Sequence, residues 1–221
     1  MGVLVAGGTG ALGRAVVAEL IASGYGCALT WVVEEERRRA EQEFGERASL
    51  IHADLLDPAG AAEAVAAVDE LEAVVNLVGG FAAGGRVHET DPQEFARMLQ
   101  LNLTPGFNLA RAGMPRMIER GGGAYVGVSA QSIWKPFAGA AGYITAKSAV
   151  LAFIRALDAE YKADGIRCNA ILPSVIDTPA NRADMPDADH SKWVQPAAIA
   201  KVVRFLVSDE SSPTTGAAIP V

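Results

Sequence analysis

Short apolar runs alternate along the chain with longer segments whose apolar residues recur at helical spacing. The run at residues 3–6 precedes a cluster of glycines and then an amphipathic stretch at 14–21, which predicts a strand, a turn and a helix. The same pattern repeats to the end of the chain. It predicts strands at 27–33, 49–53, 73–78, 124–128 and 167–172, helices at 34–44, 58–68, within 92–119, 142–163 and 196–207, and a final apolar run at 217–221.

The predicted strands are unbroken apolar runs, which is typical of strands buried on both faces of a parallel sheet. Alternation with helices therefore predicts an α/β fold, a doubly wound parallel sheet of the Rossmann type inside a three-layer αβα sandwich. No change in composition marks a boundary, so we expect residues 1–221 to form one domain. Segment 177–194, rich in Pro, Asp and Asn, is predicted to be a long connection and a candidate lid.

Composition narrows the range of partners. The chain has 221 residues, half of them apolar, and a formal net charge of −7, which argues against nucleic acid and anionic membranes as partners. Because no apolar run approaches about 18 residues and the first strand leaves no room for a leader, we expect a cytoplasmic protein. The two cysteines lack a second thiol or histidine at metal spacing, so we expect buried free thiols and no metal site.

The glycine-rich turn between the first strand and the first helix is a candidate phosphate cradle. Glycines there let backbone N–H groups approach a pyrophosphate at the helix N-terminus, which predicts a nucleotide-binding site. Tight turns of this kind also need glycine for purely structural reasons. The candidate cofactor-binding residues of this turn are Gly7, Thr9, Gly10, Ala11, Leu12 and Gly13.

Two further predicted strands end in candidate cofactor contacts. Asp54 and Leu55 follow the strand at 49–53, where the carboxylate is placed to accept a hydrogen bond from an adenine amino group. Asn76 and Gly79 end the strand at 73–78, where small residues would let a cofactor lie across the sheet edge. For Asn76, a simple capping role at the strand end is the alternative.

Tyr143 and Lys147 are four residues apart in a predicted helix, so the phenol and the ammonium share one face. An adjacent ammonium favours the phenolate and should lower the pKa of the tyrosine toward a working range. This pair is the candidate proton-transfer device of the chain, although a solvated surface pair would have the same spacing.

With these motifs in this order, and with Asn102 in a long helix and Ser129 at a strand end, the chain resembles the short-chain dehydrogenase/reductase family over essentially its whole length. The resemblance implies an NAD(P)-binding Rossmann-type domain. It also implies that Tyr143 is the acid and base, that Lys147 lowers its pKa and binds the nicotinamide ribose, that Ser129 holds the substrate oxygen, and that Asn102 anchors a water.

The residues themselves favour these roles but leave alternatives open. Ser129 follows a buried strand that would deliver its hydroxyl to the sheet edge, where Ser132 is its nearest competitor and a turn-capping role is possible. Asn102 occupies an apolar position of a helix, where a buried amide needs hydrogen-bond partners. A functional water, a backbone contact or a structural kink in the helix would each provide them.

Two loops, 79–85 and 172–189, are similar to those of quinonoid dihydropteridine reductases. Those enzymes lack the serine and the helix asparagine, so Ser129 and Asn102 favour ketone or alcohol chemistry. After the strand at 167–172 the chain carries Pro173-Ser174 where the family commonly has Pro-Gly, and Thr178 is available for the nicotinamide carboxamide.

The choice between NAD(H) and NADP(H) depends on the end of the strand at 27–33. NAD-preferring relatives commonly place an acid there, and this chain has Trp31 and Val32, with Trp31 packing either on the adenine or on the core edge. Because the acid is missing, and Arg14 or Arg37 could reach a 2′-phosphate, the sequence favours NADP(H).

We therefore expect an NAD(P)-dependent oxidoreductase that acts on a small carbonyl or alcohol substrate. The alternatives are a dihydropteridine-reductase-like enzyme and a dinucleotide sensor without catalysis. The resemblance further implies a homodimer or homotetramer built through the two long helices.

Overall fold

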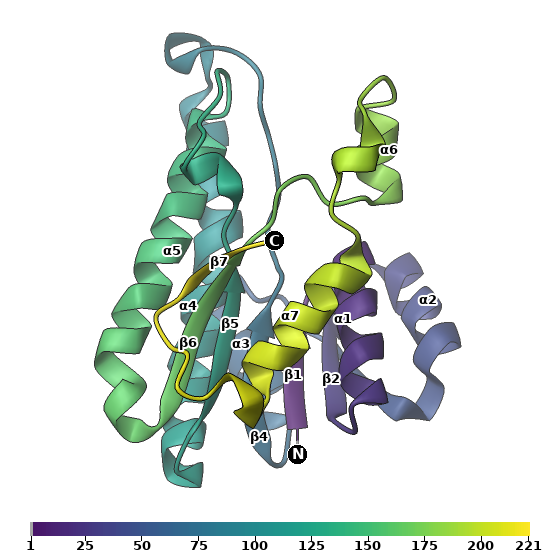
Figure 1. Ribbon diagram of the computed structural model, residues 1–221, viewed down its shortest axis with the longest axis vertical. Helices are drawn as coiled ribbons and strands as arrows, with labels where there is room; N and C mark the ends of the chain where they lie inside the picture. Colours follow the sequence, from purple (N-terminus) through teal and green to yellow (C-terminus); the bar gives the residue numbers. More distant parts are fainter. Residues whose placement is uncertain (1) are drawn as a thin grey trace.

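Seven parallel strands form one sheet in the computed structural model, which describes residues 2–221 (Figure 1). Their order across the sheet is β3-β2-β1-β4-β5-β6-β7. The strands are β1 (Gly2–Ala6), β2 (Gly26–Trp31), β3 (Ala48–His52), β4 (Leu71–Asn76), β5 (Gly123–Val128), β6 (Ile166–Leu172) and β7 (Ala218–Pro220). The predicted doubly wound parallel sheet is confirmed.

Helices cover both faces of this sheet (Figure 1). Core residues of α1, α2 and α7 pack on one face, and those of α3, α4 and α5 pack on the other. The helices are α1 (Ala11–Ala22), α2 (Glu34–Phe44), α3 (Pro58–Ala66), α4 (Pro92–Arg120), α5 (Ala141–Tyr161), α6 (Pro179–Asp184) and α7 (Pro196–Val207).

The central strands are apolar because both of their faces lie under helices. Val3, Leu4 and Val5 of β1 have no exposed surface and contribute alternately to the two core layers. The strand order reverses at β1, whose neighbours are β2 and β4. In open α/β sheets, ligands bind outside the carboxyl ends of the strands at such a reversal, so the loops that follow β1, β4, β5 and β6 form the candidate site.

Several predicted bounds need correction: the strand at 73–78 is Leu71–Asn76, and the helices at 58–68 and 142–163 end at Ala66 and Tyr161. The strand predicted at 27–33 ends at Trp31, because the ladder with β3 stops at the pair Trp31 and His52 and leaves Val32 and Val33 exposed. Segment 177–194, predicted to be a connection, contains α6 and a short 3-10 helix, His190–Lys192. The Thr178 side chain accepts a hydrogen bond from the Asn181 N–H and caps α6, a local signal that composition alone did not reveal.

Candidate active site

Tyr143 and Lys147 lie one turn apart at the start of α5, as the spacing predicts. The Lys147 ammonium nitrogen is 5.9 Å from the centre of the Tyr143 ring. Only 6% of Lys147 is exposed, and its Nζ donates a hydrogen bond of 3.1 Å to the Val128 carbonyl at the end of β5. The ammonium is thus fixed at the carboxyl edge of the sheet, and the alternative of a solvated surface pair is excluded for Lys147.

Burial controls the acidity of both groups. It lowers the pKa of Lys147 to about 8, because the buried cation loses hydration. It raises the pKa of Tyr143 above its usual value for the same reason. The sequence predicted a lowered pKa for Tyr143, on the basis of the nearby Lys147 ammonium. In the structure, desolvation of the phenolate is the stronger effect.

Asn102 and Lys147 meet around Gly79, in the loop after β4. A Cβ atom at Gly79 would lie 2.6 Å from Asn102 Oδ1 and 2.9 Å from Lys147 Nζ, so a larger residue there would displace at least one of these side chains. Asn102 also accepts a hydrogen bond of 3.2 Å from the Gly80 N–H and donates one of 3.1 Å to the Gly80 carbonyl. The buried amide therefore holds the loop against α4, with Lys147 of α5 close to Gly79.

Asn102 obtains its remaining partner within its own helix. Its Nδ2 donates a hydrogen bond of 2.9 Å to the Met98 carbonyl one turn earlier. Of the alternatives that the sequence left open, the backbone contact is the one present. The amide that should anchor a water is bonded to backbone at Oδ1 and Nδ2, so the water relay stays a prediction.

Ser129 is buried between β5 and α5, with 1% of its surface exposed. Its hydroxyl donates a hydrogen bond of 2.8 Å to the backbone carbonyl of Lys147. The hydroxyl keeps its acceptor lone pairs and can rotate toward another partner, so the role of Ser129 in holding the substrate oxygen stays a prediction. Its competitor, Ser132, has a buried Oγ with no hydrogen-bond partner among residues 2–221.

The glycine turn has the geometry of a phosphate cradle. Gly7 adopts φ +72°, and a Cβ at Gly13 would overlap the Gly7 carbonyl, so the turn packs more closely than other residues allow. Gly10 is the N-cap of α1, and among the described residues no side chain caps it. The first N–H groups of α1, starting with Ala11 and Leu12, are thus free to bind an anion.

A carboxylate that sequence reasoning missed lies beside this turn. The Thr9 hydroxyl donates a hydrogen bond of 3.0 Å to Glu36 Oε2, which joins the turn to the first turn of α2. The signal was available in the sequence, because dinucleotide sites commonly carry an acid about 20 residues after the glycines. Glu36 stands between glutamates and arginines of a charged run, which made it look like solvated surface.

The other predicted cofactor contacts lie at the same sheet edge. Asp54 Oδ1 accepts a hydrogen bond of 2.9 Å from the Leu56 N–H, and the neighbouring Leu55 is buried in the core. Asn76 is buried and accepts a hydrogen bond of 3.2 Å from the Val78 N–H. The strand-end capping role is thus present for Asn76, while the adenine contact of Asp54 stays a prediction.

Pro173 and Thr178 follow β6 on the far side of the cradle. The Pro173 carbonyl accepts a hydrogen bond of 3.0 Å from the Gln131 N–H, which connects the loops after β5 and β6. Thr178 Oγ1 accepts a hydrogen bond from Asn181 but keeps its own proton. It can donate that proton to a carboxamide carbonyl, as predicted from the resemblance.

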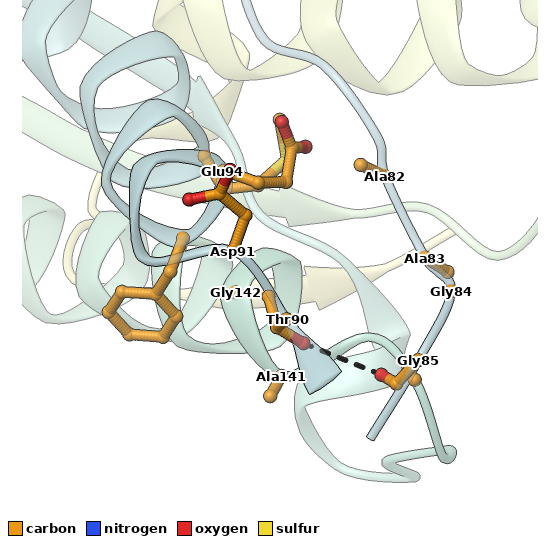
Figure 2. A pocket seen from close by; sticks show the side chains of 12 residues that line it. Ala82, Ala83, Gly84, Gly85, Thr90, Asp91, Glu94, Ala141 and Gly142 are labelled. Carbon is orange, nitrogen blue, oxygen red and sulfur yellow. Dashed lines mark hydrogen bonds between the residues drawn. The ribbon is translucent and has the colours of Figure 1, made fainter. Parts of the chain in front are cut away.

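A cavity of about 290 Å³ lies between the loop after β4 and the first turns of α4 and α5, and its lining includes Gly142, the residue before Tyr143 (Figure 2). Phe81 packs edge-on against Tyr143, with ring centres 5.0 Å apart, although 61% of Phe81 is exposed. Among the described residues that line the cavity, none is basic. They are Ala82, Ala83, Gly84, Gly85, Thr90, Asp91, Glu94, Phe95, Met98, Gly139, Ala141 and Gly142.

The described part of the chain holds no group of three or more His, Cys, Asp or Glu residues that could bind a metal ion. Within the same residues, no helix is long and apolar enough to cross a membrane. Cys27 and Cys168 are buried free thiols, as predicted.

Known proteins match this chain over nearly its whole length. A family model described as short chain dehydrogenase matches residues 2–189. A 3-beta-hydroxysteroid dehydrogenase of Comamonas testosteroni is 30% identical over 96% of this chain and 91% of that protein. An acetoacetyl-CoA reductase of Rhizobium meliloti is 31% identical over 98% of this chain and 94% of that protein. A solved structure, a short-chain type dehydrogenase/reductase from Mycobacterium ulcerans, is 26% identical in sequence. The match covers 100% of this chain and 87% of that protein's chain, with a TM-score of 0.93.

Proposed function

Because this chain belongs to the short-chain dehydrogenase family, whose NAD(P)(H)-dependent members act on CH–OH or C=O groups, we propose that Tyr143 is its acid and base. The observation that carries the proposal is the position of Lys147, buried beside the Tyr143 ring at the carboxyl edge of the sheet. Such an edge is where an open α/β sheet presents its reacting groups.

The proposed reaction moves a hydride and a proton. A nicotinamide held beside Tyr143 and Lys147 would supply or accept the hydride at the carbon of the carbonyl or alcohol. In the reducing direction, the Tyr143 hydroxyl gives its proton to the oxygen as that oxygen gains charge. Lys147 places a cation beside the phenolate that remains, which offsets the desolvation that raises the pKa of Tyr143.

The residues present fit a dinucleotide. The uncapped N-terminus of α1 and the closely packed glycine turn accept a pyrophosphate. At Gly79 the absence of a side chain lets the backbone of the loop after β4 lie close to Asn102 and Lys147, beside the proposed nicotinamide position. Lys147 and Thr178 supply donors for the ribose and the carboxamide.

For the substrate, we propose a small, uncharged ring ketone or the matching alcohol. The cavity of about 290 Å³ is at the small end of ligand sites. Phe81 precedes the lining residue Ala82, and Phe137 lies two residues before the lining residue Gly139, with their ring centres 6.5 Å apart; we propose that they add apolar surface at the edge of the cavity. Asp91 borders the cavity, Glu94 beside it is paired with Arg97 at 2.8 Å, and none of the described lining residues is basic, which disfavours anionic carriers such as the coenzyme A thioester named for one relative.

Reduction of a quinonoid dihydropterin is the second candidate. The two residues that set this chain apart from dihydropteridine reductases both bond to backbone, Ser129 to Lys147 and Asn102 to Gly80. If Ser129 keeps this bond to Lys147 when substrate is bound, the site would work with Tyr143 as its side-chain donor, as the dihydropteridine reductases without this serine do.

We further propose a cytoplasmic homodimer or homotetramer that pairs the exposed sides of α4 and α5. Phe107 of α4 is half exposed and faces Phe153 of α5, with ring centres 6.2 Å apart. Burial of such apolar surface favours association. Light scattering behind a sizing column would report the mass, and a monomer at micromolar concentration would contradict this assembly.

One assay tests the enzymatic proposal. Protein fluorescence is titrated with NADH and NADPH, and the tighter cofactor is then offered with cyclic ketones and diketones, a quinonoid dihydropterin and an acyl-CoA thioester. We expect turnover to be fastest with an uncharged ring ketone. Faster turnover of the pterin would establish the second candidate. Cofactor binding without turnover of any compound would favour a sensor and overturn the proposed role of Tyr143.

A further inference from the structure

The space beside the glycine turn carries a negative charge that the strand pattern does not reveal. Glu36 comes from α2, not from the end of β2, yet its Oε2 accepts a hydrogen bond of 3.0 Å from Thr9 in the turn itself. Thr9 is nearly fully buried, so its hydroxyl holds the carboxylate in a defined place. The contact joins residues 27 positions apart in the sequence.

A dinucleotide whose pyrophosphate occupied the uncapped start of α1 would bring its adenosine ribose to the α2 side of the turn, near Glu36. In doubly wound folds, an acid about 20 residues after the glycines accepts a hydrogen bond from the ribose 2′-hydroxyl. The carboxylate repels a 2′-phosphate through like charge. Glu36 has one oxygen engaged by Thr9 and the rest of its acceptor capacity available.

The arginines that would attract a 2′-phosphate are already paired. Arg14 contacts Glu43 at 2.7 Å. Arg37 contacts both Glu34 and Glu41 at 2.8 Å, and its guanidinium lies over the Trp31 ring at 5.6 Å. Their charges are thus balanced within α2 and between α1 and α2, and the first turn of α2 is acidic at three successive positions.

We propose that Glu36, positioned by Thr9, makes this protein select NAD(H) over NADP(H). The inference rests on the proposed function, since it assumes that a dinucleotide occupies the cradle. It reverses the preference for NADP(H) that the sequence favoured. That preference depended on the lack of an acidic residue at the end of β2, and in the structure Glu36 of α2 supplies the acid instead.

The test is binding, measured without substrate. Dissociation constants for NADH and NADPH are determined by fluorescence for the wild type, Glu36→Gln, Thr9→Val and Glu35→Gln. Glu35 is the matched control: it lies in the same turn, carries the same charge and pairs with the exposed Arg39 at 3.2 Å. Thermal melting confirms that each variant is folded.

We expect wild type to bind NADH at least about 10-fold tighter than NADPH, the size of one hydrogen bond to a charged group. Glu36→Gln should reduce this ratio by about 10-fold, mainly by improving NADPH binding, since the like charge is removed. Thr9→Val should reduce it less, and Glu35→Gln should leave it unchanged.

A wild type that prefers NADPH, or a ratio that Glu36→Gln does not change, overturns the inference and leaves the proposed function intact. Failure of both cofactors to bind the wild type overturns the proposed function and this inference together. An equal effect of Glu35→Gln would assign the selectivity to the general charge of α2 and contradict a specific role of Glu36.

Discussion

Ser129 and Lys147 are joined by a hydrogen bond, and a second bond ties Lys147 to Val128, the residue before Ser129. The Ser129 hydroxyl donates to the Lys147 carbonyl at 2.8 Å, and the Lys147 ammonium donates to the carbonyl of Val128, the residue before Ser129, at 3.1 Å. The end of β5 is thereby fastened to the turn of α5 that carries the proposed acid and base. From these two hydrogen bonds we predict that Ser129 contributes more to the position of Lys147 than to proton transfer or substrate binding.

Replacing Ser129 by alanine should therefore lower the free energy of unfolding by about 1 kcal/mol, the typical value of one buried hydrogen bond. Turnover should fall less than about 10-fold. Denaturant unfolding and steady-state kinetics measure the two effects. Ser148→Ala is the control, because its hydroxyl bonds to Ile144 on the exposed side of the same helix. A 100-fold loss of turnover with unchanged stability would restore Ser129 as a substrate contact.

Tyr143→Phe removes the proposed proton donor and keeps the ring that packs against Phe81. We expect the turnover number to fall by about 10² to 10⁴, while the dissociation constant of the cofactor changes less than about threefold. Single-turnover kinetics and fluorescence titration give the two values. Tyr161→Phe, at the other end of α5, should behave as wild type. Near-normal turnover of Tyr143→Phe would remove the tyrosine from the mechanism.

Gly79→Ala places a methyl group against Asn102 Oδ1 and Lys147 Nζ, at 2.6 and 2.9 Å before relaxation. We expect cofactor affinity to fall by at least about 10-fold, because the loop must move into the cofactor space or displace the ammonium. Gly84→Ala is the control, since a Cβ there meets nothing within 4 Å. Fluorescence titration compares the two variants, and equal affinities would show that the loop adapts freely.

The lowered pKa of Lys147 predicts how stability changes with pH. Lysine ordinarily titrates at 10.5 and is protonated in the unfolded chain, whereas in the folded protein its pKa is about 8. Between these values the unfolded state binds more protons, so the free energy of unfolding rises with pH. The full shift corresponds to about 3 kcal/mol.

Denaturant unfolding at pH 7 to 10 tests this, with Lys147→Met as the variant that cannot titrate. The difference in stability between wild type and Lys147→Met should move in favour of wild type as the pH rises above 8. Lys201→Met, at an exposed position of α7, is the control and should show no such trend. A difference that is constant over this range would contradict the shifted pKa.

The sequence by itself determined the layers and most of the elements. β1 is buried on both faces, so its residues form an unbroken apolar run, and α7 is buried on one side, so its apolar residues recur at helical spacing. These are local patterns in the sequence, and they predicted a parallel sheet with helices on both faces. The four-residue spacing of Tyr143 and Lys147 likewise fixed their shared face, because helix geometry alone sets it.

Tertiary structure decided which partner each polar group has. Ser129 turns toward Lys147, Asn102 reaches Gly80 across 22 positions, and Glu36 reaches Thr9 across 27. No local periodicity encodes these contacts, because they depend on how α2, α4 and α5 lie against the sheet. Burial decided the direction of the Tyr143 pKa for the same reason: the water that a phenolate loses depends on the packing of the whole site, not on the neighbouring residues in the sequence.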